Sequence, residues 1–309
     1  MVPMRTLKNG VNMPMLGFGT WTLQGQSCTE LVAYALQHGY SAIDTAQAYQ
    51  NEEAVGEGIR CSGRNRKDIF LTSKLRNRFQ GYDTTLKAVE ASLQRTGSDY
   101  IDLFLIHWPG ESAYIPTWKA LVRLYKEGML RSIGVSNFCP EHLERCAQES
   151  GIMPMVNQIE MHPYLQQYDT VDYCQKNDIF LVSWSPLSAA GANRQDTKTR
   201  GMSCANVMED PVIVSIAKIH DKTPGQIVLR WHIQNGFGII PKSSNYGHII
   251  ENTKLFNFKL TASEMKQIQE LTKKQIRIGD DPKTYRFLLL KDLLASGKNM
   301  EKDQFGNIL

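Results

Sequence analysis

The sequence predicts an α/β protein folded as one (β/α)8 TIM barrel, with a short N-terminal β-hairpin and a C-terminal extension. Short apolar segments rich in β-branched residues recur along the chain, which is typical of strands buried on both faces of a parallel sheet. They repeat at roughly 30 residues, about the length of a βαβ unit. Doubly wound sheets alternate in the same way. Because the strand candidates number eight, the closed barrel is the better prediction.

The predicted strands end at a polar residue or at a Gly/Pro turn. They are Met15–Gly17, Ser41–Asp44, Ile69–Ser73, Ile101–Ile106, Ile133–Val135, Val156–Glu160, Phe180–Trp184 and Gly238–Ile240. The predicted helices carry apolar residues at helical spacing, and several open with Pro or with Thr/Ser-x-x-Glu, as helices often do. They are Glu30–His38, Thr84–Thr96, Thr117–Glu127, Pro140–Gln148, Val212–Ile219, Pro224–Asn235 and Ser263–Lys273.

Three segments lie outside the eightfold repeat of what we interpret as a single domain, residues 1–309. Arg5–Asn9 and Val11–Met13 flank an Asn-Gly pair, which predicts a hairpin turn; we expect it at the bottom of the barrel. The polar segment Leu187–Val207 predicts a long loop after the seventh strand. Residues 274–309 form a C-terminal tail, with a helical apolar pattern over Thr284–Leu294. The tail covers the barrel mouth or docks on the barrel's flank.

Composition excludes several classes of protein. The chain has 309 residues, 42% of them hydrophobic and 21% charged, enough to bury a large core. The net charge of +4 comes without a basic run, so we expect no nucleic-acid partner. No apolar stretch spans a membrane, and prolines and glycines interrupt the apolar segment near the N-terminus. The six cysteines show no CxxC spacing, so we expect reduced thiols in a cytoplasmic protein and no metal. We also expect a monomer.

Four titratable side chains follow neighbouring strands of the predicted barrel. They are Asp44, Tyr49, Lys74 and His107. TIM barrels place their active sites at the carboxyl ends of the strands. Each residue alone has an ordinary structural interpretation, such as a helix cap, a packed ring or a solvated amine. Taken together, a carboxylate, a phenol, an ammonium and an imidazole at one end of a barrel predict a catalytic site.

The set has a chemical logic. An ammonium at Lys74 favours the phenolate of Tyr49 and is expected to lower the phenol's pKa. A carboxylate at Asp44 holds that ammonium charged and in place, and the imidazole of His107 orients a substrate oxygen. The result is a proton donor for an oxygen that gains negative charge, as in carbonyl reduction. Because side chains supply no hydride, a nicotinamide cofactor is implied.

The usual dinucleotide fingerprint does not explain cofactor binding. Gly17-Phe18-Gly19 begins like it, but Thr22 is at the place of the third glycine. Pro241–Asn245, which precedes a helical stretch, is the better candidate for an anion site, because backbone N–H groups, an ammonium and two hydroxyls converge there.

Three longer stretches carry a resemblance. They are Gly39–Ala46 followed by Tyr49, Asn51 and Glu52; Arg131–Phe138; and Ile240–Ser243 followed by Glu251 and Asn252. Shorter stretches support it in the same order: Leu16–Trp21, Thr72–Leu75, Leu105–Pro109, Asn157–Tyr164 and Ser185–Leu187. By these motifs the chain resembles the aldo-keto reductase family from about residue 5 to about residue 270.

The resemblance implies an enzyme that reduces aldehydes and ketones to alcohols with NADPH. It implies Asp44, Tyr49, Lys74 and His107 as the catalytic tetrad, with Tyr49 as the proton donor. The implied contacts to the cofactor are Thr20, Trp21, Asp44, Ser136, Asn137, Gln158, Trp184, Ser185, Leu187, Lys242, Ser243, Ser244, His248, Glu251 and Asn252, of which Glu251 and Asn252 contact adenine. Among them, Ser136, Asn137 and Gln158 hold the carboxamide, Trp184 stacks on the ring, and Lys242 and Ser243 contact the 2′-phosphate. The implied substrate contacts are Trp21, Tyr49, Arg76, His107 and Trp108.

Two residues depart from the family pattern. His248 replaces an Arg that stacks on adenine and adds charge near the 2′-phosphate, so NADH is a weaker alternative cofactor. Arg76 replaces a Trp found in many relatives, which favours an anionic or polyhydroxylated carbonyl substrate.

Two other functions remain open from the sequence. A sensor or regulatory protein of the same fold would bind nicotinamide cofactor with little turnover. A Schiff-base enzyme would use Lys74 as its nucleophile, although a neighbouring carboxylate opposes the low lysine pKa that such chemistry needs.

Overall fold

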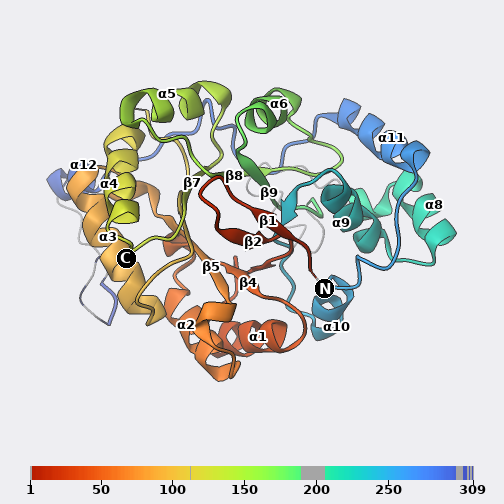
Figure 1. Cartoon of the computed structure of the whole chain (residues 1–309), viewed down its shortest axis with the longest axis horizontal. Helices are drawn as coiled ribbons and strands as arrows, with labels where there is room; N and C mark the ends of the chain where they lie inside the picture. The colour runs from red at the N-terminus through yellow and green to blue at the C-terminus, as the bar shows by residue number, and fades with distance from the viewer. Residues whose placement is uncertain are drawn as a thin grey trace.

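An eight-stranded parallel sheet forms the centre of the molecule (Figure 1). In the computed structural model the described residues are 2–111, 113–188, 206–296, 302–304, 306 and 308. The sheet consists, in spatial order, of β10 (Gly238–Ile239), β9 (Phe180–Trp184), β8 (Val156–Glu160), β7 (Ile133–Ser136), β6 (Leu103–Ile106), β5 (Phe70–Leu75), β4 (Ala42–Asp44) and β3 (Phe18–Gly19). A parallel bridge between Leu16 and Ile239 joins its two edges. The predicted (β/α)8 barrel is confirmed.

Six of the eight strands begin or end at residues other than those predicted. Two of these differences affect the closure of the barrel and the placement of Lys74. The first strand is β3 rather than Met15–Gly17, although Leu16 just before it makes the closing bridge. Strand β5 extends to Leu75, so that Lys74 lies inside the sheet. All residues of β5 and β6 are buried. Burial on both faces explains why β6 is apolar throughout, whereas β5 also buries Thr72, Ser73 and Lys74.

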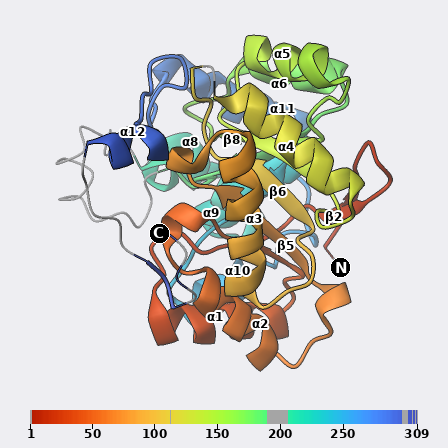
Figure 2. The same cartoon turned by 90° about the vertical axis from the view of Figure 1, so that its left-hand side faces the viewer.

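Helices surround the sheet (Figures 1 and 2). Those near predicted positions are α1 (Gly25–Gln37), α3 (Tyr82–Thr96), α4 (Tyr114–Lys126), α5 (Pro140–Ser150), α8 (Pro211–His220), α9 (Pro224–Gln234), α10 (Tyr246–Glu251) and α11 (Ala262–Glu270). Two helices were not predicted, α2 (Glu52–Cys61) and α6 (Tyr168–Lys176). Helix α2 contains Gly56 and Gly58, which weaken the local helical signal. A Cβ on Gly56 would lie 2.3 Å from the Thr96 carbonyl oxygen, so close packing against α3 requires glycine there.

The N-terminal hairpin is confirmed. It consists of β1 (Met4–Thr6) and β2 (Asn12–Pro14), with Gly10 in the left-handed region of the turn. Arg5 pairs with Asp178 at 2.6 Å, and the Asn9 amide donates to the Arg131 carbonyl. Because both partners precede strands of the sheet, the hairpin lies at the amino end of the barrel, as predicted.

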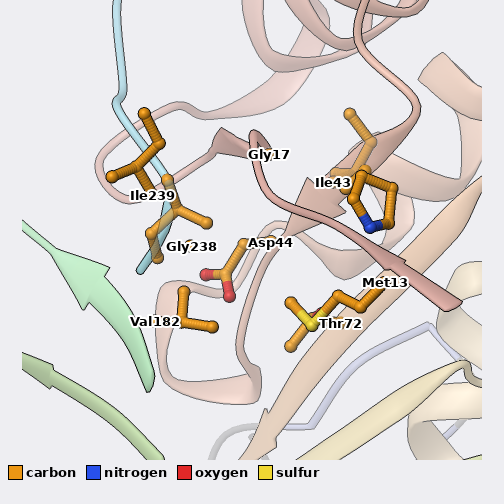
Figure 3. A pocket seen from close by; sticks show the side chains of 11 residues that line it. Met13, Gly17, Ile43, Asp44, Thr72, Val182, Gly238 and Ile239 are labelled. Atoms are coloured by element: carbon orange, nitrogen blue, oxygen red, sulfur yellow. The ribbon is translucent and has the colours of Figure 1, made fainter. Parts of the chain in front are cut away.

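Behind the hairpin the barrel interior is nearly filled. Figure 3 shows Met13 of the hairpin beside Asp44, Thr72 and Val182. The space between the lining side chains is about 10 Å³, room for roughly one water molecule. The barrel interior is therefore a packed core rather than a pore. A site that binds a ligand is expected at one end of the barrel, not inside it.

The start of the tail departs from the prediction. The helix predicted over Thr284–Leu294 is wrong for its first half, because only α12 (Leu290–Ala295) is helical. The N–H groups of Thr284 and Tyr285 both donate to the Asp281 carbonyl, which forms a turn instead. Figure 2 shows α12 at the side of the molecule. Most of the loop predicted over Leu187–Val207 lies outside the described residues, which include only its two ends.

Candidate active site

The four predicted catalytic side chains come from three adjacent strands of the barrel. Asp44 ends β4, and Tyr49 ends the 3-10 turn η1 (Gln47–Tyr49) that follows it. Lys74 lies near the carboxyl end of β5, and His107 directly follows β6. Because β4, β5 and β6 are neighbours, their carboxyl ends bring these side chains to one place.

Lys74 is the centre of this group. Its Nζ atom donates to Asp44 Oδ1, to the Thr45 carbonyl at 3.0 Å and to the Tyr49 hydroxyl at 3.3 Å. The Lys74 side chain is fully buried, so its charge must be satisfied by these oxygens. The rings of Tyr49 and His107 meet edge to face, with centroids 5.7 Å apart. The structure therefore brings all four residues together.

The surroundings of each group set its protonation. Burial would by itself lower the pKa of Lys74, but the charges of Asp44 and Tyr49 outweigh it and raise that pKa. Burial raises the pKa of Tyr49, against the opposing effect of the Lys74 ammonium. The lowered pKa of Tyr49 that was expected from the ammonium alone is therefore wrong, because burial outweighs the Lys74 charge. Burial, followed by the nearby Lys74 charge, lowers the pKa of His107 to about 3. At neutral pH the site thus holds a protonated phenol, an ammonium and a neutral imidazole.

Two buried side chains that sequence reasoning did not single out for a role hold the segment carrying Tyr49. Asn51 accepts from the Thr45 hydroxyl at 2.6 Å and donates to the carbonyls of Thr20 and Leu23, each at 2.9 Å. Gln47 accepts from the Arg76 N–H at 2.8 Å and donates to α3. No local pattern marks these roles, because every partner except Thr45 is distant in sequence.

Amide groups lie beside the tetrad. Gln158 donates to the second oxygen of Asp44 at 2.7 Å, and Asn137 donates to Ser136 at 3.1 Å and to the His107 carbonyl at 3.0 Å. The indole N–H of Trp184 donates to Asn137 Oδ1 at 2.8 Å. The predicted carboxamide-binding residues and the predicted stacking ring therefore form one connected group next to Asp44.

The remaining residues predicted on this side are near the same strand ends. Thr20 is buried and donates to the Asp44 carbonyl at 2.9 Å. Trp21, which follows it, is 47% exposed. Ser185 and Leu187 follow β9 and are partly buried. Asp44 and Lys74 are buried, whereas Tyr49 and His107 are half-buried. The exposed indole beside this group is available to a ligand.

The residues predicted for the adenosine half follow β10. Burial lowers the pKa of Lys242, and within the described part of the chain no acidic side chain forms an ion pair with it. Ser243 accepts from the Asn245 N–H at 3.0 Å, and Ser244 and His248 are exposed. Two other predicted residues are already engaged, since Thr223 donates to Glu251 at 2.6 Å and Asn252 is buried.

The tail contacts the predicted substrate side. The rings of Tyr285 and Trp108 lie 4.6 Å apart, and the Asn77 amide donates to the Tyr285 hydroxyl at 3.3 Å. Arg286 pairs with Glu111 at 2.6 Å. Arg76 is half-buried at the end of β5. Residues 285–286 therefore contact the loops that follow β5 and β6.

The described residues lack two features, a metal site and a membrane-spanning helix. They contain no group of three or more His, Cys, Asp or Glu side chains placed to hold a metal ion. None of their helices has both the length and the apolar composition needed to cross a membrane.

Comparison with known proteins decides the family. A sequence model of the Aldo/keto reductase family matches residues 15–273. The chain belongs to this family. It is 46% identical to the 9,11-endoperoxide prostaglandin H2 reductase of Trypanosoma cruzi over 281 residues, which cover 91% of this chain and 95% of that protein. It is 45% identical to the glyoxal reductase of Bacillus subtilis over 277 residues, covering 89% and 95%.

A solved structure agrees with these sequence matches. A crystal structure of a Gox0644 mutant in complex with NADPH aligns with a TM-score of 0.85 and 41% identity, covering 93% of this chain and all of that one. The predicted family, fold and class of enzyme, an aldo-keto reductase, are confirmed.

Proposed function

We propose that the protein reduces aldehydes and ketones to alcohols with NADPH, and that Tyr49 donates the proton. The observation that carries this proposal is the 3.3 Å contact between Lys74 Nζ and the Tyr49 hydroxyl, inside a buried site where Asp44 holds the ammonium. Reduction of a carbonyl requires an acid at the oxygen that becomes the alcohol. NADPH supplies the hydride when it is bound.

The residues present fit this cofactor at both ends. The amides of Asn137 and Gln158 and the ring of Trp184 surround the carboxyl ends of β7, β8 and β9, where a nicotinamide and its carboxamide would be held. Lys242, an ammonium without an acidic partner among the described residues, would hold the 2′-phosphate with Ser243 and Ser244. His248 lies beside them and, in place of the family's Arg, makes NADH a weaker alternative.

The proton path follows from the pKa directions. Tyr49 keeps its proton at neutral pH because burial raises its pKa. As the substrate oxygen gains negative charge, the nearby Lys74 ammonium stabilises the phenolate left behind. Asp44 keeps that ammonium in position through its contact with Nζ. His107, neutral by its low pKa, donates a hydrogen bond that orients the substrate oxygen without competing as the acid.

The raised pKa of Lys74 also separates this function from a Schiff-base mechanism. A nucleophilic lysine must be neutral, whereas the contact with Asp44 holds Lys74 protonated. A sensor protein with the same fold is the second candidate, since cofactor binding alone would use the same residues.

The substrate is a small carbonyl compound. We propose that Trp21, Arg76 and Trp108 contact it beyond the tetrad, and that the tail covers part of the barrel mouth through Tyr285. An arginine in this position favours anionic or polyhydroxylated substrates.

We also propose that the protein is a single-domain monomer in the cytoplasm. Five of its cysteines, all among the described residues, are free thiols, in keeping with this compartment.

The test is NADPH oxidation by the purified full-length protein. The substrates are neutral aromatic aldehydes, acidic aldehydes, ketones and sugars, each measured again with NADH. We expect turnover with NADPH, weaker turnover with NADH, and a preference for acidic or hydroxylated carbonyls. Tight NADPH binding without oxidation against the whole panel would favour the sensor function. Equal turnover of neutral and acidic aldehydes would remove the role assigned to Arg76.

A further inference from the structure

The carboxylate of Glu160 holds the start of the tail. Glu160 ends β8 and is fully buried. Its Oε1 atom accepts from the Ile278 N–H at 2.6 Å, and its Oε2 atom accepts from the Gly279 N–H at 2.9 Å. His162 Nε2 lies 3.0 Å from Oε1. One buried carboxylate thus binds two successive backbone N–H groups of a segment that is 118 residues away in sequence.

This contact brings the tail backbone close to the Trp184 ring. A Cβ atom on Gly279 would lie 2.6 Å from the indole Cη2 atom and 3.2 Å from Glu160 Oε2. Gly279 is not among the residues with positive φ, so the backbone itself accepts other residues. Glycine is therefore required by the close approach to the indole, and not by backbone conformation.

Trp184 connects this contact to the site. Its indole N–H donates to Asn137, and Asn137 in turn donates to the His107 carbonyl. The ring is thus fixed on one edge by Asn137 and on its far edge by Gly279. A ring held at both edges lies in one orientation, which reduces the entropy lost when a flat ligand stacks on it.

We propose that Glu160 and Gly279 are positioning residues for the nicotinamide. Glu160 fixes the tail backbone, Gly279 fixes the Trp184 ring, and the ring presents one face to the cofactor. This inference rests on the proposed function, because it takes the Trp184 ring as the surface on which the nicotinamide stacks. Docking of the tail and binding of the cofactor are then linked.

The experiment measures the dissociation constant for NADPH by fluorescence in the full-length wild type, Gly279→Ala and Glu160→Gln. We expect both variants to weaken NADPH binding about tenfold, which corresponds to about 1.4 kcal/mol. Gly225→Ala is the matched control, because a Cβ there meets only ordinary contacts from 3.5 Å; we expect no change in it. Thermal unfolding of the free proteins shows that each variant is folded.

A double-mutant cycle isolates the contact with the ring. In a Trp184→Phe background the distant indole atoms are absent, so Gly279→Ala should have no further effect on NADPH binding. Equal NADPH affinity for the wild type and Gly279→Ala would overturn the inference, as would an unchanged effect of Gly279→Ala in the Phe background. Both outcomes leave the proposed function standing. That function fails instead if the wild type binds NADPH but oxidises it with no carbonyl compound.

Discussion

The two ends of the barrel bury a carboxylate in different ways. At the amino end, Asp102 forms ion pairs with Arg66 at 2.8 Å and with Arg131 at 2.9 Å, and it accepts from the Leu71 N–H at 3.0 Å. Both arginines reach solvent, with side chains 22% and 46% exposed. At the carboxyl end, Asp44 pairs with Lys74, which is fully buried and also contacts a phenol.

The charged groups around Asp102 stabilise the fold, whereas those around Asp44 are arranged for a reaction. Both carboxylate oxygens of Asp102 accept hydrogen bonds, one from the Leu71 N–H and one from the Arg131 side chain. These bonds connect neighbouring strands and the turns before them. The Lys74 ammonium, in contrast, is shared with a phenol whose proton can be given away. Barrels of this kind generally keep stability at the amino end and chemistry at the carboxyl end. Substitutions at the two ends should accordingly change different measured quantities.

The largest effect is expected for Tyr49→Phe. Removing the hydroxyl removes the proposed proton donor, so kcat/KM should fall by about 10²- to 10⁴-fold. The NADPH dissociation constant and the melting temperature should stay close to those of the wild type. Tyr82→Phe, at a surface tyrosine that is 37% exposed, serves as control in the same steady-state assay. Activity retained in Tyr49→Phe would show that another group supplies the proton.

Lys242→Ala should weaken NADPH binding by about 10- to 100-fold, because a charge-assisted contact to the 2′-phosphate is lost. NADH binding should hardly change, since NADH has no such phosphate. Isothermal titration with both cofactors measures the two constants, with Lys266→Ala, an exposed lysine on α11, as control. If the two cofactors lost affinity equally, the phosphate would have to be bound elsewhere.

At the amino end, Asp102→Asn should lower the free energy of unfolding by about 1–3 kcal/mol and leave kcat unchanged. The exposed pair of Asp178 and Arg5 is the matched control at the same end, and Asp178→Asn should change stability by less than about 1 kcal/mol. Urea unfolding gives both values. A loss of kcat in folded Asp102→Asn would contradict the division between the two ends.

The smallest effect concerns acid stability. His107 has a pKa of about 3 when folded and about 6.5 when unfolded. The unfolded chain therefore binds the extra proton first, and stability falls as the pH falls from 6.5 toward 3. In His107→Gln the free energy of unfolding should decline less steeply between pH 7 and pH 5, by up to about 1.4 kcal/mol per pH unit. His232, with a pKa lowered to about 4, retains part of the effect. An unchanged slope in urea unfolding would show that His107 is charged in the folded protein.

The sequence alone was sufficient for the barrel and for the meeting of the tetrad. Buried strands are rich in apolar residues, and polar residues at their carboxyl ends must converge once the sheet closes. The direction of the Tyr49 pKa could not be predicted, because it depends on how much water the folded site excludes. The hydrogen bonds of Asn51 and Gln47 were equally hidden, since most of their partners lie on other elements.

The tail shows the same limit. A run of leucines over residues 288–290 suggested one helix, yet the turn at Asp281 and the contact of Tyr285 with Trp108 keep the preceding residues out of it. The bonds of Glu160 to Ile278 and Gly279 join segments over 100 residues apart. Contacts between segments so far apart can change the secondary structure that the local sequence pattern predicts. No short sequence motif indicates such contacts.

The most direct test of the central claim is the alkaline limb of kcat for carbonyl reduction, measured in the wild type and in Lys74→Met. In the proposed mechanism reduction requires protonated Tyr49, so activity should be present below the pKa of that phenol and be lost above it. Because the Lys74 ammonium lowers the pKa of Tyr49 against burial, its removal should slow turnover and move the limb to higher pH. A slower Lys74→Met enzyme with its limb at the wild-type pH would contradict the claim that Lys74 tunes the acidity of Tyr49.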